Sequence, residues 1–159
     1  MPKLDLEVPF GTGGFRSESV CRVLRFFSRF EWALKRAGFA KMRGRQISIR
    51  RRSFAREHSG AKLPHPLTGG LAYLILHPPK QQVLEDDALV WQDMPEAPEP
   101  PTLEWLLDAA YVVRNNLFHG GKTISRPARD NQLLQAAEDV LRLALECDEN
   151  VRRYYEEPI

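Results

Sequence analysis

Three long segments place their apolar residues at the spacing of an amphipathic α-helix, and this periodicity constrains the fold more than any other feature. The segments span residues 17–37, 102–118 and about 127–148. In the first, a single apolar stripe is formed by Val20, Val23, Leu24, Phe27, Phe30 and Leu34. Helices of this length, each with one face to bury, favour an antiparallel bundle. We therefore predict a mainly α-helical fold.

The chain length indicates one domain with an insertion. At 159 residues and 43% hydrophobic content, the chain can form one core but is too short for two comfortable ones. We expect residues 1–16 to be a leader and residues 41–101 to be inserted into the bundle. No apolar run approaches the ~20 residues of a membrane span, and no signal pattern opens the chain. We therefore expect a cytoplasmic protein with no membrane segment.

The insertion predicts only small elements of structure. Residues 41–62 are basic and poorly periodic, which indicates an irregular segment that is mobile or ordered by a ligand. Within them, the alternation at Ile47 and Ile49 favours a short strand. The apolar run 71–76 is too short to decide between helix and strand. Residues 81–91 surround an acidic turn and predict a β-hairpin.

Charge is distributed unevenly along the sequence. Residues 1–62 carry 15 Lys or Arg and 5 Asp or Glu, whereas residues 63–159 carry 8 and 16. A basic half suggests a face for an anionic polymer such as RNA. The alternative is that the two halves pair with each other, within one chain or across a dimer.

The first helix carries charged residues at two informative places. At ~100° per residue, four arginines fall within roughly 60° of one another, opposite the apolar stripe: Arg22, Arg25, Arg29 and Arg36. They could contact phosphates, or they could form an ordinary solvated face. Glu31 lies inside the apolar stripe, where a carboxylate needs a partner if it is buried.

The helix predicted over residues 102–118 is apolar on two sides. One stripe consists of Leu103, Leu106, Leu107, Ala110, Val113 and Leu117. Trp105 and Val112 lie on the opposite side, and a helix that is apolar on two sides is buried on two sides. In a small domain this pattern points to a core on one side and a second subunit on the other, so we expect a homodimer.

Arg114 and His119 are the strongest candidates for a chemical site. Arg114 interrupts the apolar stripe, where a permanently charged guanidinium is rarely found without a reason. Asn115 and His119 are four residues apart and share a helical face, so the amide can orient the imidazole. Arg114 and His119 point about 140° apart on an ideal helix. The helix must therefore loosen over residues 118–121, Arg114 must reach around it, or a second subunit must close the gap.

The spacing of this pair is weak evidence by itself. Arg51 and Arg52 stand at similar distances from His58 in the basic segment. A histidine in the last turn of a helix, before Gly120, can also simply stabilise the exposed carbonyls. The pair Arg114 and His119 lies on a segment with clear helical periodicity, whereas Arg51, Arg52 and His58 lie in the basic segment. This context distinguishes the first pair from the second.

The run LLDAAYVVRNNLFHGG, followed by a final helix rich in Leu and Ala, resembles the HEPN superfamily. The signature of that family is Arg-x4–6-His at the end of the penultimate helix, with a polar residue after the arginine. The segments RFFSRFEWALKRAGF and PPKQQVL are also similar to stand-alone bacterial members. In one subfamily a tyrosine two residues after the histidine is the target of a nucleotidyltransferase antitoxin. This chain has Gly121 at that position, so the resemblance does not extend to that regulation.

The resemblance implies a helical bundle that dimerises across the motif helix, and many members are metal-independent ribonucleases of toxin–antitoxin, abortive-infection or RNA-processing systems. It makes Arg114 and His119 the catalytic pair and Asn115 their polar adjunct, without metal or cofactor. A ribose 2′-OH would attack the adjacent phosphate, which gives a 2′,3′-cyclic phosphate and a 5′-OH. His119 would transfer protons, and Arg114 would stabilise the charge on the phosphorane.

Further residues are expected to support this site. Glu31 is expected to pair with Arg114, and Asn116 is a second supporting residue. The candidates for contact with the RNA backbone are Arg22, Arg25, Arg29, Arg50, Arg51, Arg52 and Lys122. An antitoxin or another protein is a possible partner. The alternatives are a HEPN-like module that binds RNA, nucleotide or protein without cleavage, and a nucleotide-binding subunit of a larger complex.

Overall fold

A computed structural model describes residues 17–118 and 127–158. In order along the chain, the elements are α1 (Ser17–Arg36), β1 (Ala40–Arg43), β2 (Gln46–Ile49), α2 (Arg51–Glu57), α3 (Gly69–Leu76), β3 (Lys80–Glu85), β4 (Ala88–Asp93), α4 (Leu103–Phe118), α5 (Pro127–Cys147) and α6 (Glu149–Glu156). The fold is mainly α-helical with two small antiparallel β-hairpins, which confirms the prediction of a mainly α-helical chain. Among the described residues, no helix has both the length and the apolarity to cross a membrane.

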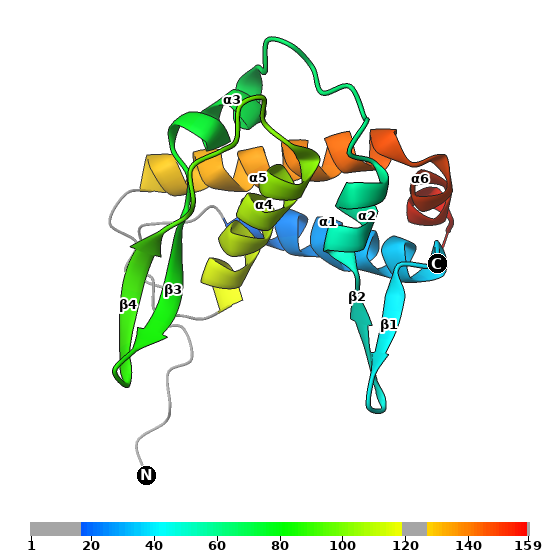
Figure 1. Cartoon of the computed structure of the whole chain (residues 1–159), viewed down its shortest axis with the longest axis horizontal. Coiled ribbons are helices and arrows are strands. Elements are labelled where there is room, and N and C mark those ends of the chain that lie inside the picture. The colour runs from blue at the N-terminus through cyan, green and yellow to red at the C-terminus, as the bar shows by residue number, and fades with distance from the viewer. Residues whose placement is uncertain (1–16, 119–126, 159) are drawn as a thin grey trace.

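The core lies between the three long helices. α5 runs across the body and packs against α1, α3, α4 and α6, while α1 also contacts α4 (Figure 1). The largest fully buried side chains of these helices include Phe27, Phe30, Leu34, Leu106, Leu107, Leu134 and Leu141. The predicted stripe on α1 is therefore confirmed, although Val20 and Leu24 are only half-buried. Each fully buried side chain of this kind stabilises the fold by roughly 1.5–3 kcal/mol relative to an exposed one.

The helix ends follow local signals in the sequence. α1 stops before Gly38, whose φ of +97° lies in the left-handed region that favours glycine. The Phe39 N–H then donates to the Leu34 carbonyl over 2.9 Å. At the start of α4, the Trp105 N–H donates to the Thr102 hydroxyl oxygen over 3.3 Å, as expected of an N-cap.

The prediction of an irregular basic segment is wrong. Residues 40–49 form the β1–β2 hairpin, and residues 51–57 form α2. α2 packs against α4 and buries Phe54 and Ala55 in the core. A helix of two turns is too short to show helical periodicity in the sequence. Most residues of α2 are charged, so its two buried positions, Phe54 and Ala55, do not form a recognisable apolar stripe.

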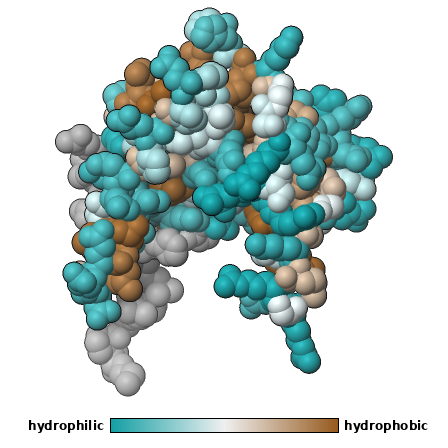
Figure 2. All heavy atoms as spheres, in the orientation of Figure 1, coloured by the Kyte–Doolittle hydropathy of each residue, from teal (hydrophilic) through white to brown (hydrophobic). Residues whose placement is uncertain are grey.

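The hairpin predicted around the acidic turn is present as β3–β4. Asp86 and Asp87 both have positive φ, the backbone of a tight two-residue hairpin turn. Leu84, Leu89 and Trp91 are exposed on this hairpin, where Figure 2 shows a hydrophobic patch. Both hairpins project from the same side of the helical body, and the C-terminal end of α4 lies between them (Figure 1).

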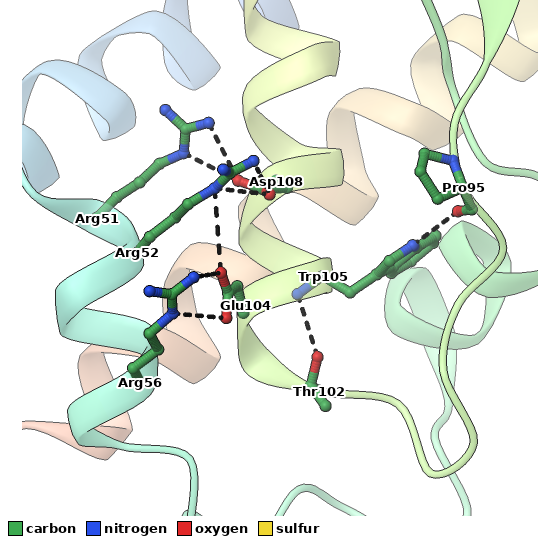
Figure 3. Close-up of polar contacts among 8 residues, drawn as sticks. All are labelled: Arg51, Arg52, Arg56, Pro95, Thr102, Glu104, Trp105 and Asp108. Atoms are coloured by element: carbon green, nitrogen blue, oxygen red, sulfur yellow. Dashed lines mark hydrogen bonds and ion pairs between the residues drawn. The ribbon is translucent and has the colours of Figure 1, made fainter.

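The second apolar side of α4 is covered by the same chain. Trp105 is buried, and its Nε1–H donates to the Pro95 carbonyl over 2.9 Å (Figure 3). Val112 is half-buried and packs on the core. The linker before α4 therefore accounts for the burial of Trp105, which we had attributed to a second subunit. The apolar pattern of α4 is consequently no argument for a dimer.

α3 packs closely on α5 at Gly70, which leaves no room for a larger side chain. A Cβ atom added at Gly70 would lie 2.4 Å from Asp139 Oδ2 and 2.6 Å from the Ala136 Cα. Gly70→Ala should therefore lower the free energy of unfolding by about 1–3 kcal/mol, measured by chemical denaturation. Gly60→Ala is the control, since no atom lies within 4 Å of its added Cβ, and should change that energy by less than about 0.5 kcal/mol. Equal effects of the two substitutions would contradict the packing.

Candidate functional site

Arg114 lies in the C-terminal half of α4, where Glu31 and Asn115 contact its guanidinium. Its Nη2 is 3.7 Å from Oε1 of Glu31 on α1, and its Nη1 donates to Asn115 Oδ1 over 3.1 Å. The side chains of Arg114 and Glu31 are 31% and 22% exposed, so this ion pair is partly shielded from water. The predicted contact between Glu31 and Arg114 is confirmed. It joins the two helices and restricts the direction in which the guanidinium points.

A pocket of about 420 Å³ opens beside this ion pair. It lies between α1 and α4 and is lined by Leu24, Phe27, Ser28, Glu31, Trp32, Lys35 and Arg114. Lys35 and Arg114 are cationic, and Glu31 is already paired with Arg114. The pocket therefore offers positive charge and a hydroxyl group to an anionic ligand.

Tyr111 on α4 is buried near the Glu31–Arg114 ion pair. Its ring packs edge-on against Phe27 at a centroid distance of 5.1 Å, and the guanidinium of Arg51 lies over it at 4.6 Å. Burial raises the pKa of the Tyr111 phenol well above its ordinary value, and the nearby Glu31 carboxylate raises it further, against the opposing charges of Arg51 and Arg114. Tyr111 is therefore a neutral group near the ion pair at neutral pH. Sequence analysis missed it because it looked like one more apolar position of the helix.

The raised pKa of Tyr111 predicts a particular dependence of stability on pH. Above the ordinary tyrosine pKa of ~10, the unfolded chain loses this proton while the folded chain keeps it, so stability falls as pH rises. Tyr111→Phe should remove this contribution. Between about pH 10 and 11, its free energy of unfolding should fall less steeply than that of the wild type, by up to ~1.4 kcal/mol per pH unit. Identical slopes in the two proteins would contradict the assigned environment.

Two of the predicted site residues, His119 and Lys122, lie outside the described residues, as does the expected loosening of the helix over 118–121. The described part of the helix α4 ends at Phe118, four residues after Arg114. His119 is the next residue in the sequence. Asn116, the second supporting residue predicted, donates its Nδ2 N–H to the Lys80 carbonyl over 2.8 Å. It fixes the β3–β4 hairpin to α4.

Two arginines of the basic ridge on α1 have partners in the same chain. The Arg22 Nε lies 2.7 Å from Oε1 of the buried Glu138 on α5. Arg29 donates to the carbonyls of Tyr154, Tyr155 and Glu157 at the end of α6. Both therefore hold helices together. Arg25 and Arg36 line a second pocket next to Trp32, and Arg29 lines it as well.

The arginines of the 50–52 triplet also have structural partners. The guanidinium of Arg50 donates to the Gly38 carbonyl over 2.9 Å. Arg51 and Arg52 each pair with Asp108 on α4, at 3.0 and 2.9 Å (Figure 3). The neighbouring Arg56 pairs in the same way with Glu104 at 3.1 Å. For Arg51, Arg52 and Arg56, the observed arrangement is the predicted alternative in which the basic and acidic halves of one chain pair with each other.

The second Arg–His spacing does not produce a second site. Arg51 and Arg52 face Asp108, whereas His58 lies with Nε2 3.1 Å from Asp148 Oδ2 and Nδ1 2.9 Å from the Phe54 carbonyl. Cys147 lines a pocket with this histidine, but burial, followed by two neighbouring carboxylates, raises the pKa of its thiol. A raised pKa keeps the sulfur protonated, which does not suit a nucleophile.

Within residues 17–118 and 127–158, no three His, Cys, Asp or Glu side chains gather as a metal ion would require. Comparison of the chain with protein-family models, with curated proteins and with solved structures finds no match.

Proposed function

We propose that the protein is a metal-independent endoribonuclease of the HEPN type, with a helical bundle of that family and a role in toxin–antitoxin defence or RNA processing in the cytoplasm. The observation that carries the proposal is the position of Arg114. It is half-buried, paired with Glu31 and Asn115, and exposed to an anion-compatible pocket at the end of the helix that leads to His119. A guanidinium that interrupts an apolar stripe, is held by polar partners and faces a pocket is a candidate for a chemical site.

In the proposed reaction, the ribose 2′-OH attacks the adjacent phosphorus and the 5′-oxygen of the next nucleotide leaves. His119 supplies the acid–base group, because an imidazole with a pKa near ~6.5 can accept and donate a proton near neutral pH. Arg114 stabilises the charge that develops on the phosphorane oxygens, and its fixed direction avoids reorganisation during the reaction. Glu31 and Asn115 position Arg114.

One histidine per site cannot easily serve as both base and acid. We therefore propose a homodimer in which two copies of the motif face one cleft, with RNA as the substrate and an antitoxin or other protein as a possible regulator. Light scattering of the purified chain tests the dimer. A monomer that cleaves RNA at full rate would contradict the shared site.

The test of the proposed function is digestion of RNA with excess chelator and analysis of the product ends. The purified chain should cleave equally well with and without the chelator and should leave 2′,3′-cyclic phosphate and 5′-OH ends. A 5′-phosphate product, or loss of cleavage with chelator, would contradict the mechanism.

The second candidate is a HEPN-like module that binds RNA, nucleotide or protein without cleaving RNA. The observation that favours it is the number of arginines engaged within the chain, since Arg22, Arg29, Arg51 and Arg52 all hold other elements. In that case Arg114 and Glu31 form a structural ion pair. RNA that is bound but never cut, under all conditions of the digestion assay, would favour this module over the enzyme.

A further inference from the structure

We propose that single-stranded RNA binds along one side of α1, in a basic and aromatic groove that leads to Arg114. The groove is formed by two adjoining pockets, of about 860 and 420 Å³. They share three lining residues on α1: Leu24, Ser28 and Trp32. The larger pocket extends over Arg25, Arg29 and Arg36, and the smaller one ends at Arg114. We call the combined surface the α1 groove.

The spacing of the cations suits a polymer rather than a single small anion. Arg25 and Arg36 are eleven residues apart on one helix, which places them about 16 Å apart along its axis. Lys35 and Arg114 lie on the other side of Trp32, in the smaller pocket. Positive charge is thus spread along the groove, as is required to follow a phosphate backbone.

Three of these cations are available to phosphate. Arg25, Lys35 and Arg36 are exposed, and none of them has an acidic partner within the described part of the chain. This distinguishes them from Arg22, Arg51 and Arg52, which are paired. The acidic residues that line the groove are Glu31, which is paired with Arg114, and Glu157. The lining therefore has an excess of positive charge.

Trp32 supplies a surface on which a base can stack. Its ring is half-buried in the centre of the groove, with Tyr154 edge-on at 6.4 Å and the guanidiniums of Arg29 and Arg36 over it at 4.2 and 5.4 Å. A base would stack on the ring by displacing the exposed Arg36, which has no hydrogen bond or ion pair in the described part of the chain. Arg29 is in turn held by the carbonyls at the end of α6. The ring is therefore fixed in direction, and the stacking of a base on an aromatic ring is a main source of affinity for single strands.

These features favour an unpaired strand over a duplex. A base reaches a half-buried ring between flanking cations only if it is turned out of a stack, which a duplex resists. The identification of the strand as RNA rests on the proposed ribonuclease function. The inference that a nucleic-acid strand binds in the α1 groove is independent of that function, because it follows from the charge and the aromatic ring of the lining residues.

The test measures binding with cleavage removed. All variants carry His119→Ala, and each is titrated with a labelled single-stranded RNA of about 12 nucleotides over a series of salt concentrations. Arg25→Gln with Arg36→Gln removes two cations from the groove. Arg43→Gln with Arg45→Gln is the matched control, because it removes two exposed cations from the β1–β2 hairpin and changes the net charge equally.

The groove variant should bind about tenfold more weakly than the parent, and its slope of log K against log salt should be shallower by about 1.4. The control should stay within about threefold. Trp32→Leu should weaken binding at least about fivefold through the loss of stacking. Thermal melts of each variant show that the fold is retained, and the charge pair and Trp32 test the groove independently if one variant unfolds.

Several results would overturn the proposal: no RNA binding by the parent, equal losses in the groove and control variants, or equal affinity of the parent for duplex RNA of the same sequence. Binding that depends on the groove in a wild-type chain that never cleaves RNA would refute the ribonuclease alone. Cleavage by a wild type whose groove variant binds RNA as tightly as the parent would refute the groove alone.

Discussion

Replacement of Arg114 by lysine is expected to slow RNA cleavage by about 10²–10³-fold, the usual cost of losing one well-placed donor to a developing oxyanion. Lysine keeps the positive charge, so the ion pair with Glu31 can form again and the fold should be retained. It cannot offer the planar, two-pronged set of N–H groups that guanidinium presents to a phosphate. The loss should appear in kcat more than in KM, because the interaction is strongest in the transition state.

The matched control for this experiment is Arg142→Lys, an exposed arginine of α5 that lies over the ring of Phe26. It should cleave RNA within about twofold of the wild type, since it removes the same chemical group from outside the site. If Arg114→Lys is as active as this control, Arg114 has no role in the chemistry. Its position beside Glu31 is then structural, as in the second candidate function.

The largest expected effect on stability is that of Phe54→Ala, at about 3–5 kcal/mol in the free energy of unfolding. Phe54 is fully buried on α2, with ring centroids 6.1 Å from Phe30, 5.2 Å from Phe39 and 4.7 Å from His58. Its truncation leaves a cavity between α1 and the basic segment. Denaturation by urea measures the loss.

Met42→Ala is the control for the same experiment, because Met42 is 69% exposed on the neighbouring hairpin. It should change the free energy of unfolding by less than about 0.5 kcal/mol. A loss below about 1 kcal/mol for Phe54→Ala would mean that the basic segment is not part of the core, and would restore the prediction that residues 41–62 are irregular.

The long helices were predictable because their signals repeat over many turns. The apolar stripe of α1 was recognised from the sequence and is present in the structure. The cap at Thr102 and the glycine that follows α1, Gly38, are signals of the same local kind. The β3–β4 hairpin was predicted from its alternation and acidic turn. These features are local, so a single sequence contains the information that specifies them.

The parts that could not be predicted depend on contacts between distant segments. α2 has too few residues to show a period, and its position follows from Phe54 entering a core formed by other helices. The hydrogen-bond partner of the Trp105 ring is the Pro95 carbonyl, in the linker between β4 and α4, and no sequence pattern specifies that contact. Sequence analysis therefore recognised the burial of Trp105 but assigned it to the wrong partner.

The candidate site was predicted in part for the same reasons. Glu31 and Arg114 each interrupt an apolar stripe, and two charges in that position need each other, so their pairing could be inferred. The ion pairs of Arg51 and Arg52 with Asp108 could not, because all three residues look solvated in the sequence. Trp32 and Lys35 were overlooked as ligand-facing residues, although they recur at helical spacing along the side of α1 that carries Ser28.

The central claim is that this chain cleaves RNA with Arg114 and His119, and the most direct test is the rate of cleavage by purified His119→Ala in the presence of a chelator. General acid–base catalysis by a histidine contributes about 10²–10⁴-fold, so the variant should lose at least that factor while its thermal melt matches that of the wild type. If the folded variant instead cuts RNA as fast as the wild type, His119 takes no part in the reaction and the proposed site is wrong.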